Sequence, residues 1–168
     1  MNNTQLHTLK VMREQNPKTG RYGAFYEWEN EIWFVDNDGI IVLHFTDPIE
    51  VDEIRTTRIV EPAISVLVDF IRDAESYIEV KGEYTKTNIR DFTQITETKW
   101  RRVFHYIDFM DAGLDFVVNR KYVNRALNMI KGTKVRFAYR KQGRTPIKII
   151  GNNCEAYVFP VLYNRKEG

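Results

Sequence analysis

One order of elements occurs twice in this sequence, and it limits the folds that the chain can adopt. Near residues 64–71 and again near 123–130, apolar residues recur at the spacing i, i+3, i+4, i+7, which is typical of one buried helix face. A short apolar strand precedes each helix, and three strand-like segments follow it. We interpret this order as an internal structural repeat, with a shorter version, a helix and three strands, at the N-terminus. The two apolar stripes consist of Ile64, Leu67, Val68 and Ile71, and of Val123, Ala126, Leu127 and Ile130.

Turn-forming residues and periodicity set the limits of the predicted elements. In the first third we expect a helix over about 4–14, strands over 21–28, 31–35 and 39–45, and a loop that could add an edge strand over 47–57. In the middle we expect a strand over 58–60, the helix that carries the first stripe, and strands over 76–82, 84–89 and 91–96. In the last third we expect a strand over 114–118, a helix over 120–131 ended by Gly132, and strands over 134–141, 145–151 and 155–162.

This pattern predicts one compact α+β domain built from three units. They are a partial N-terminal unit (1–50), a middle unit with a linker (51–112) and a basic C-terminal unit (113–168). Hydrophobic residues make up 43% of the 168 positions, which is enough for a packed core. No apolar run could span a membrane and the N-terminus lacks the apolar block of a signal peptide, so we expect a cytoplasmic protein with no membrane partner. Cys154 is the only cysteine, which excludes an intrachain disulfide and fits a reducing compartment.

Charge is distributed very unevenly along the chain. Residues 113–168 hold 12 Lys/Arg and 3 Asp/Glu, whereas the first 112 residues hold 13 and 20. Between Asn119 and Lys148 there are ten basic residues and no acidic one. Such segregation favours a polyanion partner, and nucleic acid in particular, for the C-terminal part. The alternative is a solvated basic face, neutralised by the acidic half of a neighbouring subunit.

The helix predicted over 120–131 gives this charge a surface. Its polar positions lie opposite the apolar stripe and combine cations with amides, which suits contact with phosphates without reading of bases. An ordinary solvent-facing helix is the alternative. The same face of the middle helix is acidic and would repel DNA. The residues predicted to contact DNA are Lys121, Asn124, Arg125 and Asn128, with Lys131 at the helix end.

Two segments invite a metal site, and both are better explained otherwise. The sequence DNDG resembles part of a calcium loop, but Phe34 and Phe45 would then stand at the first and last ligand positions, so a hairpin turn is expected. His105, Asp108 and Asp111 could form a metal or nuclease site, but they stand among aromatic residues and no second carboxylate-rich motif supports them. We therefore expect a packed linker there and no metal.

Other enzymatic signatures are missing from the sequence. Cys154 has no histidine near it in sequence, so a nucleophilic role is not expected. There is no phosphate-binding loop and no dinucleotide fingerprint. The aromatic run over 24–34 could stack bases, although such runs more often form the core of a hairpin. We expect a protein that is not an enzyme and has no cofactor.

Four stretches, taken in order, carry a resemblance to a known family. They are EIWFVDNDGIIVL (31–43), RIVEPAISVLVDFI (58–71), TKWRRVF (98–104), and VVNRKYVNRALNMI (117–130) with EAYVFPVL (155–162). Together they resemble segments of the bacterial sliding clamp, the beta subunit of the replicative DNA polymerase. The resemblance implies repeated strand–helix–three-strand units, with the helices on one face of antiparallel sheets and directed at DNA inside a ring. It also implies that 98–104 links two clamp domains.

The sequence departs from the clamp pattern at the site that binds polymerase peptides. Ile40 and Ile41 stand where clamps have His-Arg, and Leu162 follows Pro160 and Val161 where clamps end in Pro-Met-Arg-Leu. The chain is also less than half as long as a clamp subunit. The resemblance still implies a peptide groove at the C-terminal segment. Its expected residues are Phe159, Pro160, Val161 and Leu162.

These observations predict a non-enzymatic, sliding-clamp-like protein that associates with duplex DNA through the basic helix face. Replication proteins are further expected partners. Three units per chain leave one unit without a counterpart, so we expect a homo-oligomer; a clamp-sized ring has twelve units, which four copies would supply. The alternative is a protein-interaction module of clamp fold that binds a host clamp, a polymerase or its peptides.

Overall fold

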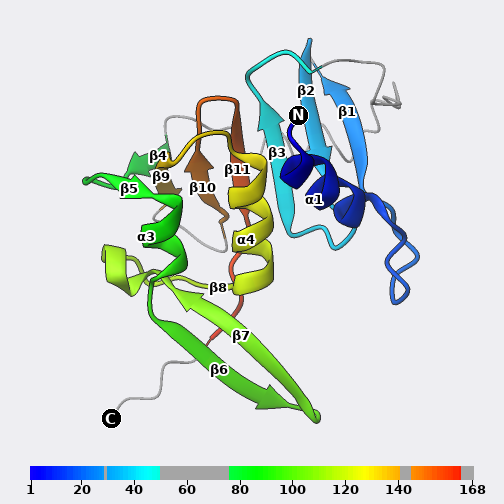
Figure 1. Ribbon diagram of the computed structural model, residues 1–168. Helices are drawn as coiled ribbons and strands as arrows, with labels where there is room; N and C mark the ends of the chain where they lie inside the picture. Colours follow the sequence, from blue (N-terminus) through cyan, green and yellow to red (C-terminus); the bar gives the residue numbers. More distant parts are fainter. Residues whose placement is uncertain (29, 50–75, 141–144, 164–168) are drawn as a thin grey trace, which may run out of the picture.

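The computed structural model describes residues 1–28, 30–49, 76–140 and 145–163 (Figure 1). The strand expected over 58–60 and the helix with the first apolar stripe lie outside the described residues. The described chain is an α+β fold whose sheets are antiparallel throughout.

The N-terminal segment forms a helix followed by a three-stranded meander, as predicted. A capping box starts the helix: the Gln5 backbone N–H donates to the Asn2 side chain (2.9 Å), and the Asn2 backbone N–H donates to the Gln5 side chain (2.9 Å). The turn at DNDG is closed by Asp36, whose carboxylate accepts from the backbone N–H groups of Ile40 and Ile41. The elements are α1 (Asn3–Arg13), β1 (Ala24–Trp28), β2 (Glu31–Val35) and β3 (Ile41–Phe45).

The C-terminal segment repeats this order after a short strand. The Lys121 backbone N–H donates to the Asn119 side chain (2.9 Å) and starts the helix, which ends two residues before the predicted end. Gly132 follows at φ 79°, a left-handed conformation that glycine adopts without strain. The elements are β8 (Val117–Asn119), α4 (Arg120–Met129), β9 (Lys134–Arg140), β10 (Ile147–Ile150) and β11 (Cys154–Val158).

The two meanders join edge to edge in one sheet. Strand β3 pairs with β11, with Leu43 opposite Ala156, so that the strand order is β1-β2-β3-β11-β10-β9-β4. Strand β11 ends at Val158, so Pro160 lies beyond the ladder and removes no strand hydrogen bond. The backbone of Val161 then donates to Val117 (2.9 Å).

Between the meanders, the chain departs from the sequence predictions in three places. The strand expected over 91–96 runs instead from Gln94 to Lys99, because Asp91 is the C-cap of a helix. The strand expected over 84–89 is wrong beyond Thr85, because Thr85 and Asn88 form a capping box that starts a short helix. The segments expected as linkers over 98–104 and around His105 form a β-hairpin instead, followed by one 3-10 turn. The elements are β4 (Tyr77–Glu79), β5 (Tyr84–Thr85), α3 (Lys86–Arg90), β6 (Gln94–Lys99), β7 (Arg102–Asp108) and η3 (Phe109–Ala112).

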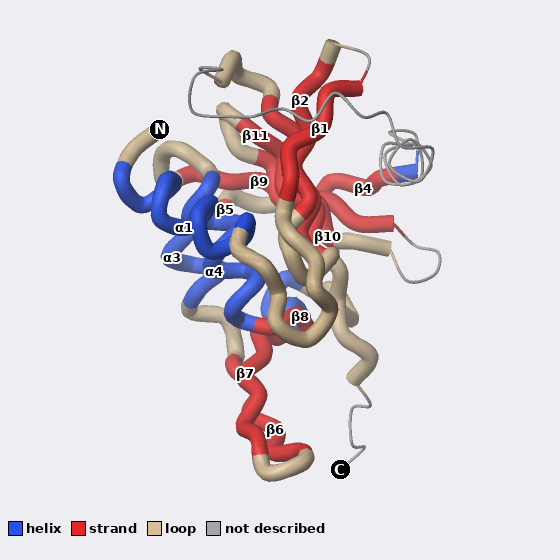
Figure 2. The backbone as a smooth tube through the Cα atoms, turned by 90° about the vertical axis from the view of Figure 1, so that its right-hand side faces the viewer, coloured by secondary structure: helices blue, strands red, loops and turns tan. Residues whose placement is uncertain are grey.

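Helices α1, α4 and α3 cover one face of the large sheet (Figure 2). The main core lies between the helices and the strands, with Met12, Leu127 and Phe137 fully buried. The second apolar stripe predicted from the sequence is part of this core. A smaller cluster lies on the other face, where Trp33 stacks on His44 with ring centroids 4.3 Å apart. This arrangement leaves the outer sides of three helices on one surface of the molecule.

Candidate nucleic-acid interface

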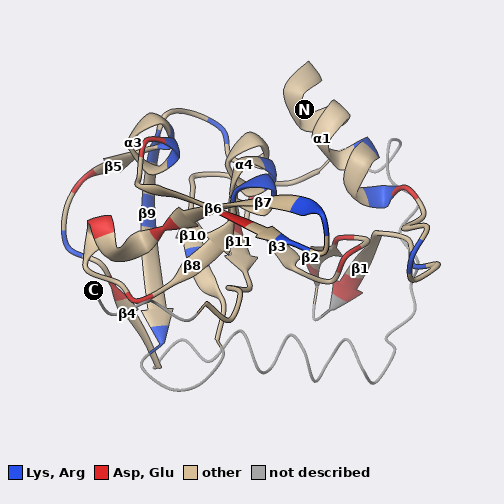
Figure 3. Ribbon diagram, turned by 90° about the horizontal axis from the view of Figure 1, so that it is seen from below, with Lys and Arg blue, Asp and Glu red and all other residues tan. Residues whose placement is uncertain are grey.

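The three helices that cover the sheet carry no acidic residue. Helices α1, α3 and α4 contain 11, 5 and 10 residues, and among these are seven Lys/Arg, one His and no Asp or Glu. We call this surface the helix layer; Figure 3 shows its basic residues. The sequence indicated a DNA-binding face only on α4; the helix expected over about 4–14 includes Glu14, whereas α1 ends at Arg13. The basic residues are Lys10, Arg13, Lys86, Arg90, Arg120, Lys121 and Arg125.

Asn128 holds the helix layer together. Its amide donates to the Thr8 hydroxyl of α1 (3.3 Å), and its side-chain oxygen accepts from the Arg90 guanidinium of α3 (2.9 Å). Lys86 also ties α3 to the end of α4, because its ammonium donates to the Ile130 carbonyl. Asn128, one of the residues predicted to contact DNA, is therefore already bonded within the protein. It positions one cation, Arg90, on α3.

Lys121 and Arg125 share one carboxylate, that of Asp38 in the turn between β2 and β3. The Lys121 ammonium and the Arg125 guanidinium each lie 3.8 Å from an Asp38 oxygen. The Tyr122 hydroxyl donates to the same oxygen (2.6 Å), and burial together with this acceptor raises the pKa of Tyr122 well above its usual value. The Lys121 side chain is 53% exposed and that of Arg125 only 19%. Lys121 is thus the accessible cation of the pair, and Asp38 neutralises part of the surface.

The remaining residues predicted for DNA contact lie along the same helix. Asn124 is half-buried, and Lys131 is exposed just beyond the end of α4. The backbone N–H of Lys131 donates to the Asn153 side chain (2.8 Å), which fixes its position relative to β11. Lys10 on α1 is exposed as well. Lys10 on α1, Lys121 on α4 and Lys131 just after α4 are therefore three solvent-facing cations.

The residues expected to form a peptide groove follow the end of β11. Phe159 packs against the small cluster around Trp33, and its backbone N–H donates to the Ile40 carbonyl (3.0 Å). Leu162 is 74% exposed. The segment is extended and packed at its start, and apolar surface is exposed near its end.

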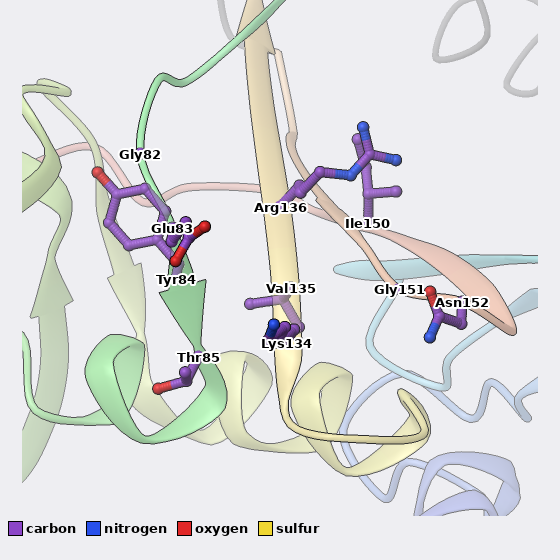
Figure 4. Close-up of a pocket in the computed structure, with 10 residues that line it drawn as sticks. All are labelled: Gly82, Glu83, Tyr84, Thr85, Lys134, Val135, Arg136, Ile150, Gly151 and Asn152. Carbon is purple, nitrogen blue, oxygen red and sulfur yellow. The ribbon is translucent and has the colours of Figure 1, made fainter.

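A cavity of about 300 Å³ lies at the end of the sheet between β5, β9 and β10 (Figure 4). Its charged lining has both signs and consists of Glu83, Lys134 and Arg136. Arg136 forms an ion pair with Glu79 of β4 at 3.0 Å. A lining of mixed charge does not favour the binding of a polyanion, so the cavity is not part of the candidate nucleic-acid interface.

Three residues that the sequence offers as metal or nucleophile candidates, Asp108, Asp111 and Cys154, have structural partners or are buried. Within the described residues, no group of three or more His, Cys, Asp or Glu could hold a metal ion. Asp108 caps η3 through the Met110 backbone N–H (3.0 Å), and Asp111 accepts from the Thr93 backbone N–H (2.6 Å), so both carboxylates have structural partners. Burial raises the pKa of the Cys154 thiol to about 12, which keeps it protonated at neutral pH.

In the part of the chain that the structure describes, no helix combines the length and the apolar character needed to cross a membrane. No family model, no curated protein and no solved structure matches the chain. Its function is therefore inferred from its own residues and their geometry.

Proposed function

We propose that this protein is a non-enzymatic DNA-binding protein, and that the helix layer contacts the phosphates of duplex DNA. The observation that carries this proposal is the composition of the layer: three adjacent helices with seven Lys/Arg and no Asp or Glu. Cations on one face release counterions from DNA when they neutralise phosphates, and this provides affinity without reading of bases. Lys10, Lys121 and Lys131 are the cations best placed to do so.

The arrangement of the elements supports a clamp-like mode of binding. Two helix-and-meander segments meet at β3 and β11, with their helices on one face of the shared sheet. This is the arrangement that the resemblance to sliding clamps implies, with helices toward DNA and strands away from it. In this proposal the protein holds the duplex electrostatically, in the company of replication proteins.

Encirclement of a duplex would require several copies of a chain of 168 residues. We therefore expect a closed homo-oligomer, and the mass in solution at micromolar concentration, measured by light scattering, checks it. A mass of several chains that does not change on further concentration agrees with a ring. A monomer excludes the ring and leaves the helix layer as an open binding face.

Neutralising Asp38 is expected to tighten the binding of duplex DNA. Asp38→Asn removes the carboxylate between Lys121 and Arg125 and keeps an oxygen that accepts from Tyr122. The dissociation constant for a blunt duplex in 0.1 M salt should fall about 3-fold to 10-fold, measured by fluorescence anisotropy. Glu79→Gln on β4 removes the same charge away from the helices and serves as the control. Equal effects of the two changes would mean that only net charge matters.

A second candidate function is the binding of a replication protein at the C-terminal segment. The exposure of Leu162, 74%, just after Pro160 favours it, since such a segment leaves apolar surface for a partner. This candidate predicts no measurable affinity of the wild-type protein for duplex DNA. The same anisotropy titration therefore separates the two functions.

A further inference from the structure

The β6–β7 hairpin extends away from the rest of the molecule (Figures 1 and 2). Its ladder runs from Gln94 opposite Ile107 to Lys99 opposite Arg102, and a loop of two residues, Trp100 and Arg101, closes it. Six residues of strand reach about 20 Å at 3.3 Å per residue. The hairpin therefore carries its tip well beyond the helices.

The tip presents one aromatic ring among cations. Trp100 is 87% exposed, the highest value among the large hydrophobic residues of the described chain. Lys99, Arg101 and Arg102 adjoin it and are exposed. Glu97 forms an ion pair with Lys99 at 2.7 Å, which leaves the two arginines as the main source of positive charge. An exposed ring beside arginines is the combination that stacks on bases and holds phosphates.

The backbone of the tip is unfavourable for the residues that occupy it. Trp100 has φ 49° and Arg101 has φ 61°, so both lie in the left-handed region. Two-residue hairpin loops with positive φ at both positions favour Asn-Gly, and bulky side chains are strained there. The sequence thus places a tryptophan and an arginine where the turn disfavours both. Strain of this kind is found at functional positions.

The base of the hairpin is attached to the helix layer. Strand β7 pairs with β8, which leads directly into α4. At the same junction the Arg120 guanidinium donates to the Gln94 side chain (3.0 Å). The hairpin is therefore an arm that begins at the N-terminal end of the basic helix α4.

We propose that Trp100 stacks on an unpaired base of DNA that is bound to the helix layer, while Arg101 and Arg102 hold the flanking phosphates. This inference rests on the proposed function and narrows its ligand to DNA in which a duplex adjoins a single strand. Bases are accessible for stacking only where they are unpaired. An anionic membrane surface would also attract an exposed tryptophan among cations, and the experiment below therefore includes lipid vesicles.

The test compares two DNA probes and four proteins. Trp100→Asn removes the ring and inserts a residue that tolerates the left-handed conformation, so the hairpin keeps its turn. Affinity for a forked DNA should fall about 10-fold, whereas affinity for a blunt duplex should change less than about 2-fold. Trp100→Tyr, which keeps an aromatic ring, should restore most of the fork affinity. Val103→Asn, a change at a 56% exposed apolar residue of the same hairpin, is the matched control and should leave both affinities unchanged.

Each further outcome has a definite meaning. Unchanged fork affinity in Trp100→Asn overturns the proposal. Loss of binding to phosphatidylserine vesicles in that variant, with fork affinity retained, makes the tip a membrane contact and also overturns it. Changes in the helix layer could lower the affinity for the duplex and leave the preference for the fork over the duplex unchanged. That result would show that Trp100 and the helix layer contribute to binding independently. Conversely, a wild-type protein that binds the fork but not the duplex refutes the helix layer and leaves Trp100 as the contact.

Discussion

Reversing the charge of Lys121 and Arg125 together is expected to weaken the binding of duplex DNA by about 10-fold to 100-fold in 0.1 M salt. The double variant Lys121→Glu/Arg125→Glu reverses the charge of the accessible cation Lys121 and of the largely buried Arg125 beside it. The slope of log K against log salt concentration should become shallower by about 1, since each lost phosphate contact accounts for nearly one unit and Lys121 is the accessible cation of the pair. Fluorescence anisotropy titrations at several salt concentrations between about 50 and 200 mM measure the dissociation constant and the slope.

The design needs two controls, because both cations also contact Asp38. Lys121→Ala/Arg125→Ala avoids bringing three carboxylates together and separates loss of contact from loss of folding. Lys81→Glu/Arg136→Glu makes the same change of charge elsewhere: Arg136 alternates along β9 with buried Val135, so it lies on the sheet face away from the helices. Wild-type affinity in a folded Lys121→Glu/Arg125→Glu protein would refute the helix layer as the DNA-binding surface.

Adding one methyl group at Gly23 is expected to lower the free energy of unfolding by about 3 kcal/mol. A β-carbon at this position would lie 2.0 Å from the Met12 carbonyl oxygen and 2.9 Å from the Phe34 ring. Met12 and Phe34 are fully buried, and the clash involves backbone that cannot rotate away. Gly23→Ala would therefore push α1 off the sheet. Urea denaturation followed by circular dichroism measures the loss.

Gly113→Ala is the matched control for this change. Gly113 has φ 78° and no atom within 4 Å of an added β-carbon, so its substitution carries only the backbone strain of about 1 kcal/mol. A loss in Gly23→Ala no larger than that in Gly113→Ala would contradict the close approach of α1 to the sheet.

The sequence predicted the two terminal segments well because their local signals agree. The apolar stripe of α4, the cap at Asn119 and the glycine at 132 all indicate one helix, and the structure places it within two residues of the prediction. In the N-terminal meander, apolar strands alternate with Asn, Asp and Gly turns, and each strand forms where expected. In these segments the local sequence pattern and the packing against the rest of the chain favour the same secondary structure.

The middle of the chain was predicted less well because its structure depends on weaker local signals. The capping box consists of only two side chains, those of Thr85 and Asn88, three positions apart. The strand-like pattern of the residues around it therefore predicted a strand over 84–89. The loop at Trp100 and Arg101 contains none of the turn residues that mark a hairpin. Segment 98–104 was therefore interpreted as a linker on resemblance alone.

The candidate site was only partly visible in the sequence. Helical spacing and charge were sufficient to select Lys121, Arg125 and their neighbours on α4. No local pattern could show that Asp38, more than 80 positions earlier, would face these cations, or that Asn128 would bridge to Thr8 and Arg90. Such pairings arise when distant segments pack, and they change which side chains remain available to a ligand.

The pairing of β3 with β11 has a consequence for how the chain is made. Phe45 and Cys154, the pair with the smallest separation in this ladder, are 109 positions apart in the sequence. The ladder therefore closes a very long loop. During synthesis the N-terminal meander leaves the ribosome with the edge of β3 uncovered, and its natural partner follows only after most of the chain has been translated. Until then that edge can accept a strand from another nascent chain. The sheet can therefore be completed only once β11 has left the ribosome, and expression at low temperature or with a chaperone should favour correct pairing over aggregation.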